Sequence, residues 1–247
     1  MKNYQKKTIF LILFGLFLNI YVIQAQTNND INIYNWYDKT VGEDNLDINN
    51  GIPHTNLYRS VQDNYLYLIN QYELGKLSYE GQNYYNVKLK YDIYRDILVL
   101  NPSGQPENIG INLTQNKVES FSIQDKNFIK IEKKIETIPE FTTGYYEVSK
   151  IAPDFIFYIK HHKDIQKTVS ENGILYSFKE NSLFFIELKN NIYLIKGKND
   201  IIKLFPEQKK QINGFYLLNR ELKQSDLNQF MKNLMKYISN SLLIQTK

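Results

Sequence analysis

The stretch that decides the fold is residues 76–94, KLSYEGQNYYNVKLKYDIY. Its two arms, residues 76–79 and 84–91, flank the segment Glu-Gly-Gln-Asn, a composition typical of a tight turn. Along the second arm, apolar and polar side chains alternate, so that one face carries Val87, Leu89, Tyr91 and Ile93. Alternation with a period of two beside such a turn predicts an antiparallel β-hairpin.

Outward from this hairpin, the same alternation recurs over most of the chain. We expect further strands at residues 65–69, 97–100, 109–113, 118–123, 128–132, 145–150, 155–161, 174–179, 183–188 and 192–196. Because these strands follow one another without intervening helices, the sequence favours an antiparallel meander, an open barrel or a sandwich over a parallel sheet. The predicted fold class is therefore mainly β (α+β), with a β-rich body over residues 26–197.

The two ends of this body differ from its middle. Residues 26–60 are polar and form an irregular lead-in, with one short strand expected at residues 31–36. Residues 198–247 have apolar side chains at helical spacing and are expected to form a helical C-terminal cap. Helices are predicted at residues 200–205 and 207–218, and a longer one begins after Ser225, which is its expected N-cap. Its apolar stripe consists of Leu227, Phe230, Met231, Leu234, Tyr237, Ile238 and Leu242.

Residues 1–25 have the pattern of a secretory signal peptide. Three lysines precede an apolar run at residues 8–23, and Ala25 stands at the expected cleavage position. The run is short for a membrane span, which needs roughly 20 residues. Because the chain has no cysteine, a lipoprotein anchor is excluded, as are a disulfide scaffold and a thiolate metal site. We expect an exported protein, periplasmic or associated with the outer membrane, without a transmembrane span after cleavage.

The net charge changes when the signal is removed. The full chain carries 30 basic and 26 acidic residues, but without its first 25 residues it has 27 basic and the same 26 acidic ones. Residues 26–150 hold 12 basic and 17 acidic side chains, whereas residues 151–247 hold 15 basic and 9 acidic ones. A nearly neutral chain with oppositely charged halves does not indicate nucleic-acid binding.

Groups with recognisable chemistry are few. The histidines are His54, in a polar loop, and the pair His161-His162, which we expect in a solvated turn between two lysines. Asp92 and Asp96 are the only candidate catalytic carboxylates, but in an extended chain they lie about 13 Å apart, too far for a glycosidase pair. A structural turn with Arg95 paired to a carboxylate is the better interpretation. No motif for a nucleotide, a metal or a cofactor is present, and none is expected.

The aromatic content is the most unusual feature of the composition. The chain holds 20 Tyr and 14 Phe, many of them in the expected strands. Tyrosine suits a sheet face because its ring packs while its hydroxyl reaches water. An aromatic platform for a glycan or a protein is one explanation, and a compositional bias towards Asn, Ile, Lys and Tyr is the other. The candidate interaction surface consists of Trp36, Tyr84, Tyr85 and Tyr94.

Two segments carry a resemblance to a known group of proteins. Residues 75–96, with a Gly-Gln turn, a Tyr-Tyr pair and the run KYDIYRD, resemble a family of exported β-rich envelope proteins of Bacteroidota. Residues 199–212 and the final helix are similar to the tail of the same family. This resemblance implies an exported location and a β-rich class, and it implies no activity or catalytic residue.

The sequence leads to three expectations of function. The first is a non-enzymatic cell-envelope protein that binds another envelope protein as an interaction or accessory subunit. The second is a carrier that encloses a lipid or another apolar ligand between a curved sheet and the helices. The third is a glycan-binding module or a cryptic glycoside hydrolase, which requires exposed Tyr or Trp36 along a cleft.

Overall fold

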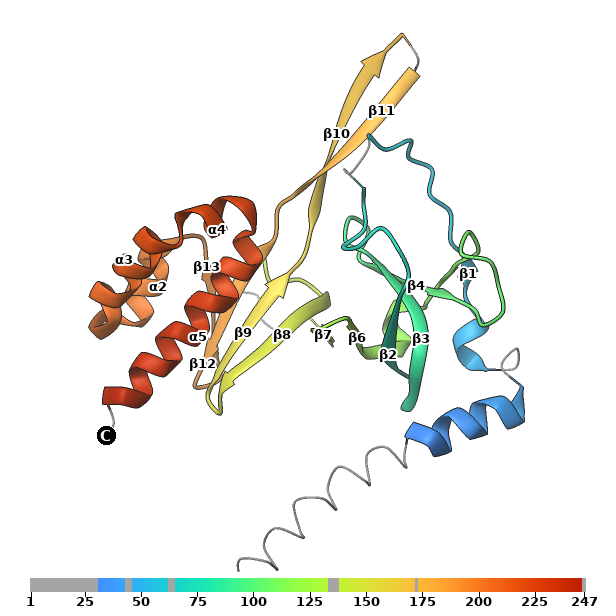
Figure 1. The fold of residues 1–247 in the computed structure, drawn as a ribbon, viewed down its shortest axis with the longest axis horizontal. Helices are drawn as coiled ribbons and strands as arrows, with labels where there is room; N and C mark the ends of the chain where they lie inside the picture. The colour runs from blue at the N-terminus through green and yellow to red at the C-terminus, as the bar shows by residue number, and fades with distance from the viewer. Residues whose placement is uncertain (1–30, 43–45, 62–64, 133–137, 172, 246–247) are drawn as a thin grey trace, which may run out of the picture.

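The computed structural model describes residues 31–42, 46–61, 65–132, 138–171 and 173–245. The expected signal peptide lies outside these residues. The main sheet is antiparallel and consists of 11 strands in the order β1-β5-β4-β3-β2-β6-β7-β8-β9-β12-β13 (Figure 1). The order runs from one free edge to the other, so the sheet is open. The predicted class, mainly β with C-terminal helices, is confirmed.

The strands of this sheet are short where they form its ends and longest in its middle. Their bounds are β1 (Ile52–Pro53), β2 (Glu73–Tyr79), β3 (Gln82–Asp92), β4 (Ile97–Asn101), β5 (Ile111–Asn112), β6 (Val118–Ile123), β7 (Lys126–Ile131), β8 (Gly144–Ala152), β9 (Phe155–Lys160), β12 (Leu183–Leu188) and β13 (Asn191–Ile195). Single 3-10 turns precede β1 and β6: η2 (Asp47–Asn49) and η3 (Gln115–Lys117). The chain follows a meander except that β1 pairs with β5, β6 pairs with β2, and β9 pairs with β12.

The hairpin predicted at residues 76–94 is confirmed as β2 and β3. Its turn consists of Glu80 and Gly81, with φ of +51° and +77°, which is the conformation that tight hairpins require. In β3, Asn86 is an extra residue, because Lys76 pairs with Tyr85 while Gly75 pairs with Val87. This bulge brings Tyr84 to the buried face that Leu89 also occupies.

Two predicted strands are wrong. Residues 31–41 form a helix instead of containing a strand at residues 31–36. Its partly buried side chains, Ile31, Asn35 and Asp38, are spaced by four and three residues, and this helical period was hidden by the alternation of the isoleucines. Residues 65–69 are irregular, with one isolated bridge from Tyr67 to Asp92. Their backbone groups bond partly to Tyr91 and Ile93 and partly to the Lys163 ammonium, rather than along one neighbouring strand.

One hairpin lies outside the main sheet. Strands β10 (Lys163–Ser170) and β11 (Gly173–Glu180) pair along their full length and project from the body as a separate two-stranded sheet (Figure 1). The sequence predicted β11 but not β10. At the base of the hairpin, Phe178 is buried in a cluster with Leu66 and Tyr67.

Four helices cover the half of the sheet that contains β9 and β12: α2 (Lys198–Leu204), α3 (Lys209–Leu218), α4 (Arg220–Ser225) and α5 (Leu227–Gln245), with the turn η4 (Pro206–Gln208) between the first two (Figure 1). The interface between sheet and helices is filled by buried side chains, among them Phe157, Phe184, Ile201, Ile212, Phe230, Leu234 and Ile238. The predicted helical cap is thus confirmed. Of the predicted α5 stripe, however, Leu227 and Tyr237 are exposed.

The start of α5 also differs from the prediction. Ser225 is the last residue of α4, and its Oγ donates to the carbonyl oxygen of Glu221 at 3.0 Å. The N-cap is Asp226, whose Oδ1 accepts a hydrogen bond of 2.8 Å from the amide of Gln229.

Buried aromatic side chains contribute to the cores of both halves of the sheet, and in the half away from the helices several of them pack against one another. Tyr91, Phe121, Phe128 and Tyr145 are buried there, with ring centroids 4.6 to 5.8 Å apart. Only a minority of the aromatic side chains is therefore available to a ligand or a partner.

Candidate functional site

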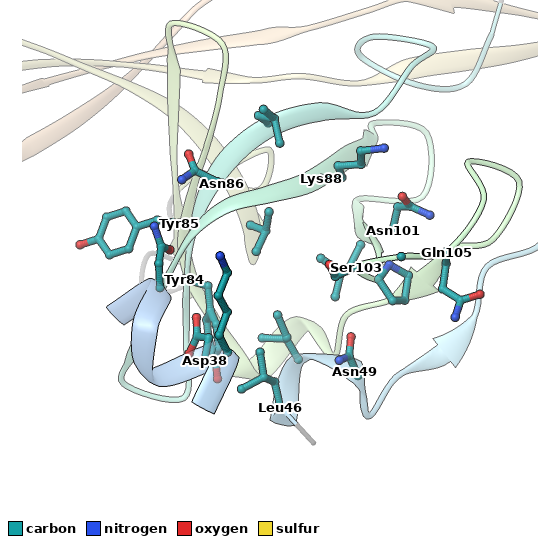
Figure 2. Close-up of a pocket in the computed structure, with 18 residues that line it drawn as sticks. Asp38, Leu46, Asn49, Tyr84, Tyr85, Asn86, Lys88, Asn101, Ser103 and Gln105 are labelled. Carbon is teal, nitrogen blue, oxygen red and sulfur yellow. The ribbon is translucent and has the colours of Figure 1, made fainter. Parts of the chain in front are cut away.

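A cleft of about 570 Å³ lies between the helix at residues 31–41 and the end of the sheet that carries β3 and β4 (Figure 2). Its apolar lining consists of Leu46, Ile48, Leu74, Tyr84, Tyr85, Val87, Leu100 and Pro102. Its polar lining is dominated by carboxamides, namely Asn35, Asn49, Asn86, Asn101 and Gln105, together with Asp38, Lys39, Lys88 and Ser103. Four segments that are distant in the sequence therefore contribute to one concave surface.

Two of the predicted aromatic residues line this cleft. Tyr84 is 2% exposed, and its hydroxyl donates to Gln82 Oε1 at 2.9 Å. Burial, followed by the charges of Asp38 and Asp47, raises the pKa of Tyr84 to about 12. Tyr85 lies at the rim, with its ring centroid 5.7 Å from that of Tyr34 and 5.8 Å from Lys76 Nζ. The adjacent tyrosines thus have different roles, one closing the wall and one facing outward.

The carboxamide side chains hold the cleft in shape and supply its hydrogen-bonding groups. Asn86 adopts φ of +59° at the bulge of β3. Asn101 is buried, and its amide nitrogen donates to the carbonyl oxygens of Pro106 at 2.9 Å and Ile109 at 2.8 Å, which holds the loop after β4. A carboxamide both donates and accepts hydrogen bonds, so such a lining is suited to a neutral polyhydroxylated ligand.

The other two predicted aromatic residues do not line the cleft. Trp36 is 66% exposed on the helix at residues 31–41. Tyr94 packs at the base of the projecting hairpin, with its ring centroid 5.2 Å from that of Phe178 and 5.7 Å from that of Tyr58. The four residues proposed from the sequence therefore do not form one surface.

Asp92 and Asp96 are both held in structural contacts. Asp92 is fully buried and accepts hydrogen bonds from the amides of Tyr94 and Arg95 and, at 2.5 Å, from Arg95 Nε. Asp96 accepts from Lys160 Nζ at 2.6 Å and from the Tyr91 hydroxyl at 2.5 Å. The predicted turn with Arg95 paired to a carboxylate is confirmed, and neither carboxylate is left without a cationic partner.

Gly144 lies against the Asp96–Lys160 pair. Its φ is +147°, and a Cβ atom at this position would overlap both Asp96 Oδ2 and Lys160 Nζ. Burial lowers the pKa of Lys160, and the charge of Asp96 offsets part of this effect. The pair is thus enclosed on the side of β8 by a residue without a side chain.

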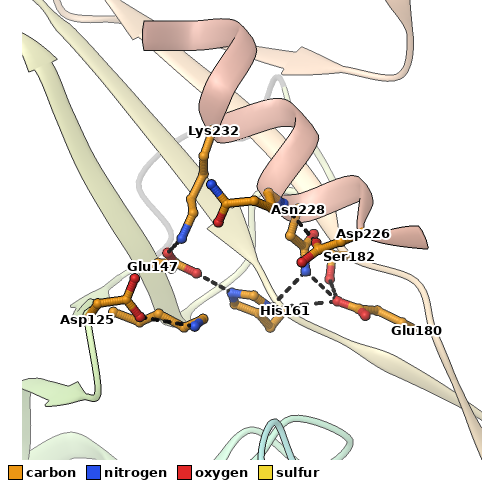
Figure 3. A network of polar contacts seen from close by, with 10 residues as sticks. Asp125, Glu147, His161, Glu180, Ser182, Asp226, Asn228 and Lys232 are labelled. Atoms are coloured by element: carbon orange, nitrogen blue, oxygen red, sulfur yellow. Dashed lines mark hydrogen bonds and ion pairs between the residues drawn. The ribbon is translucent and has the colours of Figure 1, made fainter. Parts of the chain in front are cut away.

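A second polar cluster lies under the start of α5 (Figure 3). His161 is 2% exposed, and its Nε2 lies 2.7 Å from Glu147 Oε2, while its Nδ1 faces Glu180 Oε1 at 3.9 Å and Asn228 Nδ2 at 3.4 Å. The other oxygen of Glu147 accepts a hydrogen bond of 2.7 Å from Lys232 Nζ. The expectation that His161 lies in a solvated turn is therefore wrong.

The charges in this cluster support one another. Burial lowers the pKa of His161, but the hydrogen bond and the charges of Glu147 and Glu180 outweigh it, so that the pKa is raised overall. Burial raises the pKa of Glu147, yet its contacts with His161 and Lys232 lower it overall. The proximity of His161 and a hydrogen bond from Ser182 lower the pKa of Glu180 to about 2. The cluster thus places the His161 ring between two carboxylates, an environment that favours its charged form.

Such an arrangement does not prepare a nucleophile. His161 Nε2 is hydrogen-bonded to Glu147, and the polar atoms nearest to Nδ1 belong to Asn228 and Glu180 rather than to a hydroxyl group. The nearby Ser182 hydroxyl donates to Glu180 at 3.0 Å rather than to His161. The cluster borders a polar hollow of about 590 Å³. Because its contacts join Glu147 of β8 and His161 to Lys232 of α5, we call these three residues the clamp.

No known protein family, curated protein or solved structure matches this chain.

Two features are absent from the part of the chain that the structure describes. Within these ranges, none of the helices combines the length and the apolar character needed to cross a membrane. Likewise, the described side chains include no group of three or more His, Asp or Glu arranged to hold a metal ion.

Two of the residues that line the cleft, Tyr84 and Tyr85, were candidates from the sequence, whereas the buried contacts of His161 were not predicted. His162 is exposed 3.4 Å from Asp164, whereas His54 is half-buried between Asn112 and Tyr67. Alternation along the strand did predict opposite faces for His161 and His162. The partners of His161 come from β8, β11 and α5, and no local pattern joins these segments.

Proposed function

We propose that the protein is a non-enzymatic, exported cell-envelope protein that binds another envelope protein through the hairpin β10–β11. The observation that carries the proposal is the apolar face of this hairpin. Ile165, Lys167 and Val169 share this face with their cross-strand partners Phe178, Tyr176 and Ile174. The face begins in the buried cluster at the base and continues onto the projecting half.

The base of the hairpin is anchored firmly. Lys163 Nζ donates to the carbonyl oxygens of Tyr65 and Tyr67, both at 2.8 Å, and Ser60 forms a bridge with Tyr176. The outer half has no such support, since Val169 is 74% exposed and its partner Ile174 is 41% exposed. A two-stranded hairpin is only marginally stable in water, so a projecting apolar tip gains stability when a partner covers it.

The two other expectations receive less support from the contacts. A carrier needs an apolar cavity between sheet and helices, whereas that interface is filled by side chains such as Phe157 and Phe230. A hydrolase needs available carboxylates, whereas Asp92 and Asp96 are paired with Arg95 and Lys160.

The hairpin permits a matched test. Val169 and Ile174 face each other across the two strands on the apolar face, and Gln166 and Ser177 do so on the other face. The tagged full chain is expressed in the cells that export it, cross-linked, and purified from the envelope. We expect the partner captured by the wild type to be lost with Val169→Lys/Ile174→Lys and retained with Gln166→Lys/Ser177→Lys.

Two results would overturn this proposal. One is capture of the same partner by both double variants in equal yield. The other is a purified chain that dimerises through the tip, because the tip would then bind a second copy. Export is tested in the same cells by mass spectrometry of the mature N-terminus, which is expected at Gln26.

A second candidate function, glycan binding, is favoured by the cleft of Figure 2. Tyr85 at its rim and the five carboxamides of its lining are the groups that bind sugar faces and hydroxyls. Calorimetry with cello- and chito-oligosaccharides tests it, with Tyr85→Ala/Gln105→Ala as the cleft variant. Tyr193→Ala, on the edge strand β13, is the control. No heat of binding to any of these neutral sugars, or equal binding by both variants, would count against it.

A further inference from the structure

The outer surface of the helical cap contains a basic hollow. Its volume is about 550 Å³, and Lys198 from the start of α2 and Tyr216, Leu217, Arg220 and Lys223 from α3 and α4 line it, with Asn213 and Gln224. Lys198 Nζ and Lys223 Nζ lie 5.7 and 5.5 Å from the centroid of the Tyr216 ring. Two cations thus lie near one aromatic ring and Arg220 lines the same hollow, whose lining residues include no carboxylate.

The cations of this hollow have no internal counter-charge. Among the described residues, Lys198, Arg220 and Lys223 form no ion pair, in contrast to Lys160 and Lys232. Three like charges held around one hollow repel one another, and an anion that enters it relieves that repulsion. Arginine presents its donors in a planar fork that matches phosphate oxygens, and lysine adds point charges.

The rim of the hollow is apolar and faces solvent. Leu217 is 58% exposed and Leu218 is 84% exposed, although neighbouring side chains of α3 are packed in the core. On the far side of Leu218 lies a second hollow of about 610 Å³, lined by Phe215 and by Tyr237, which is 42% exposed. Exposing two adjacent leucine side chains to water costs free energy, and their transfer into an apolar phase would recover it.

The charge and the apolar rim together indicate a membrane surface. We infer that this face of the cap binds an anionic phospholipid surface: a headgroup phosphate occupies the hollow of Lys198, Arg220 and Lys223, and Leu217 and Leu218 enter the boundary between headgroups and acyl chains. Peripheral binding of this kind combines buried apolar area with attraction to anionic lipid. A free phosphate ester would bind the cations but leave Leu217 and Leu218 in water. The exposed leucines therefore favour a lipid headgroup over a free phosphate ester as the ligand.

Vesicle sedimentation tests this inference with the protein purified from the cells that export it. We expect binding to vesicles of phosphatidylcholine with 30% phosphatidylglycerol, and at least tenfold weaker binding to phosphatidylcholine alone. Arg220→Gln/Lys223→Gln should weaken binding to the anionic vesicles about tenfold or more. The control Lys150→Gln/Lys189→Gln removes the same charge from exposed positions on the main sheet and its turns and should leave binding within twofold. Leu217→Ser/Leu218→Ser should weaken it with the cations intact.

Each contrary outcome is decisive. Equal binding to both vesicle compositions, no binding to either, or equal loss in the control variant would overturn the inference. Calorimetry with inorganic phosphate distinguishes a free phosphate ligand from a membrane headgroup. If phosphate binds and vesicles do not, the ligand is a free phosphate ester and the membrane assignment is wrong. None of these substitutions touches the β10–β11 tip, so failure here leaves the proposed protein partner unaffected.

Discussion

His161 Nε2 lies 2.7 Å from Glu147 Oε2, and both side chains are at most 3% exposed, so the sheet contains a buried ion pair between β8 and the end of β9. Lys232 of α5 binds the second oxygen of Glu147. This contact links the sheet to the helical cap through charge, in addition to the apolar core between them. Removing one member leaves the other charges buried without compensation.

The first prediction concerns this pair. Glu147→Gln should lower the free energy of unfolding by about 3 kcal/mol, because His161 and Lys232 would lose their buried counter-charge. Urea denaturation followed by circular dichroism measures it. Glu132→Gln is the control, since Glu132 is largely exposed at 3.5 Å from Lys130 and should change stability by less than about 0.5 kcal/mol. Equal effects of both substitutions would contradict a structural role for the clamp.

The second prediction is a pH dependence with a defined sign. The pKa of folded His161 is raised above 6.5, so its contribution to stability is complete below about pH 6.5 and is lost as the pH rises through the folded pKa. For Glu180 the pKa falls from 4.5 to about 2, so its contribution is present above about pH 4.5 and is lost as the pH falls towards 2. Stability from this cluster is therefore greatest between these limits.

The clamp is separated from other titrating groups by comparing variants. His54 has a pKa lowered by burial, which gives the opposite sign near neutral pH. We expect the decline in stability above pH 6.5 to be smaller in His161→Gln than in the wild type. His162→Gln, at the adjacent exposed position, should retain the wild-type decline. An NMR titration that gives His161 a pKa at or below 6.5 in the wild type would contradict the prediction, even if the variant does not fold.

The third prediction compares two glycines with positive φ. Gly144→Ala should destabilise the protein by about 3 kcal/mol, because the new methyl group overlaps the Asp96–Lys160 pair and φ is unfavourable for alanine. Gly81 has φ of +77°, near the left-handed region in which alanine costs about 1 kcal/mol, and a methyl group there meets open space, so Gly81→Ala should cost about 1 kcal/mol. Thermal unfolding of both variants measures the difference. If the two losses are equal, the close approach at Gly144 has no energetic effect.

The sequence predicted those elements whose signal is local. The hairpin of β2 and β3 follows from alternation around Glu80-Gly81, and β6, β9 and β12 follow from apolar runs between short turns. Strand β10 was missed because its sequence, KDIQKTVS, contains only Ile165 and Val169 as large apolar residues. It is a strand because β11 pairs with it, which is a tertiary effect that its own residues do not indicate.

The candidate sites depended even more on tertiary structure. Tyr84 and Tyr85 were found because two adjacent aromatic residues beside a hairpin turn are visible in the sequence itself. The carboxamides that complete their cleft come from the helix at residues 31–41, from η2, from the bulge of β3, and from the end of β4 and the loop after it. The basic hollow was missed entirely, because Lys198 and Arg220 lie on separate helices and each alone is an ordinary surface cation.

The last prediction distinguishes two adjacent residues that both favour the N-cap position. Asp226→Ala should lower stability by about 1 kcal/mol, because Asp226 Oδ1 accepts the amide hydrogen of Gln229 at the start of α5. Asp226→Asn should retain most of the stability, since asparagine caps nearly as well. Ser225→Ala should have an effect of less than about 0.5 kcal/mol, because its hydroxyl only bonds a carbonyl group within α4. Urea denaturation of the three variants measures these differences. A larger loss of unfolding free energy in Ser225→Ala than in Asp226→Ala would identify Ser225 as the N-cap of α5. The cap matters beyond its own turn, since α5 carries Asn228 and Lys232 to the buried clamp.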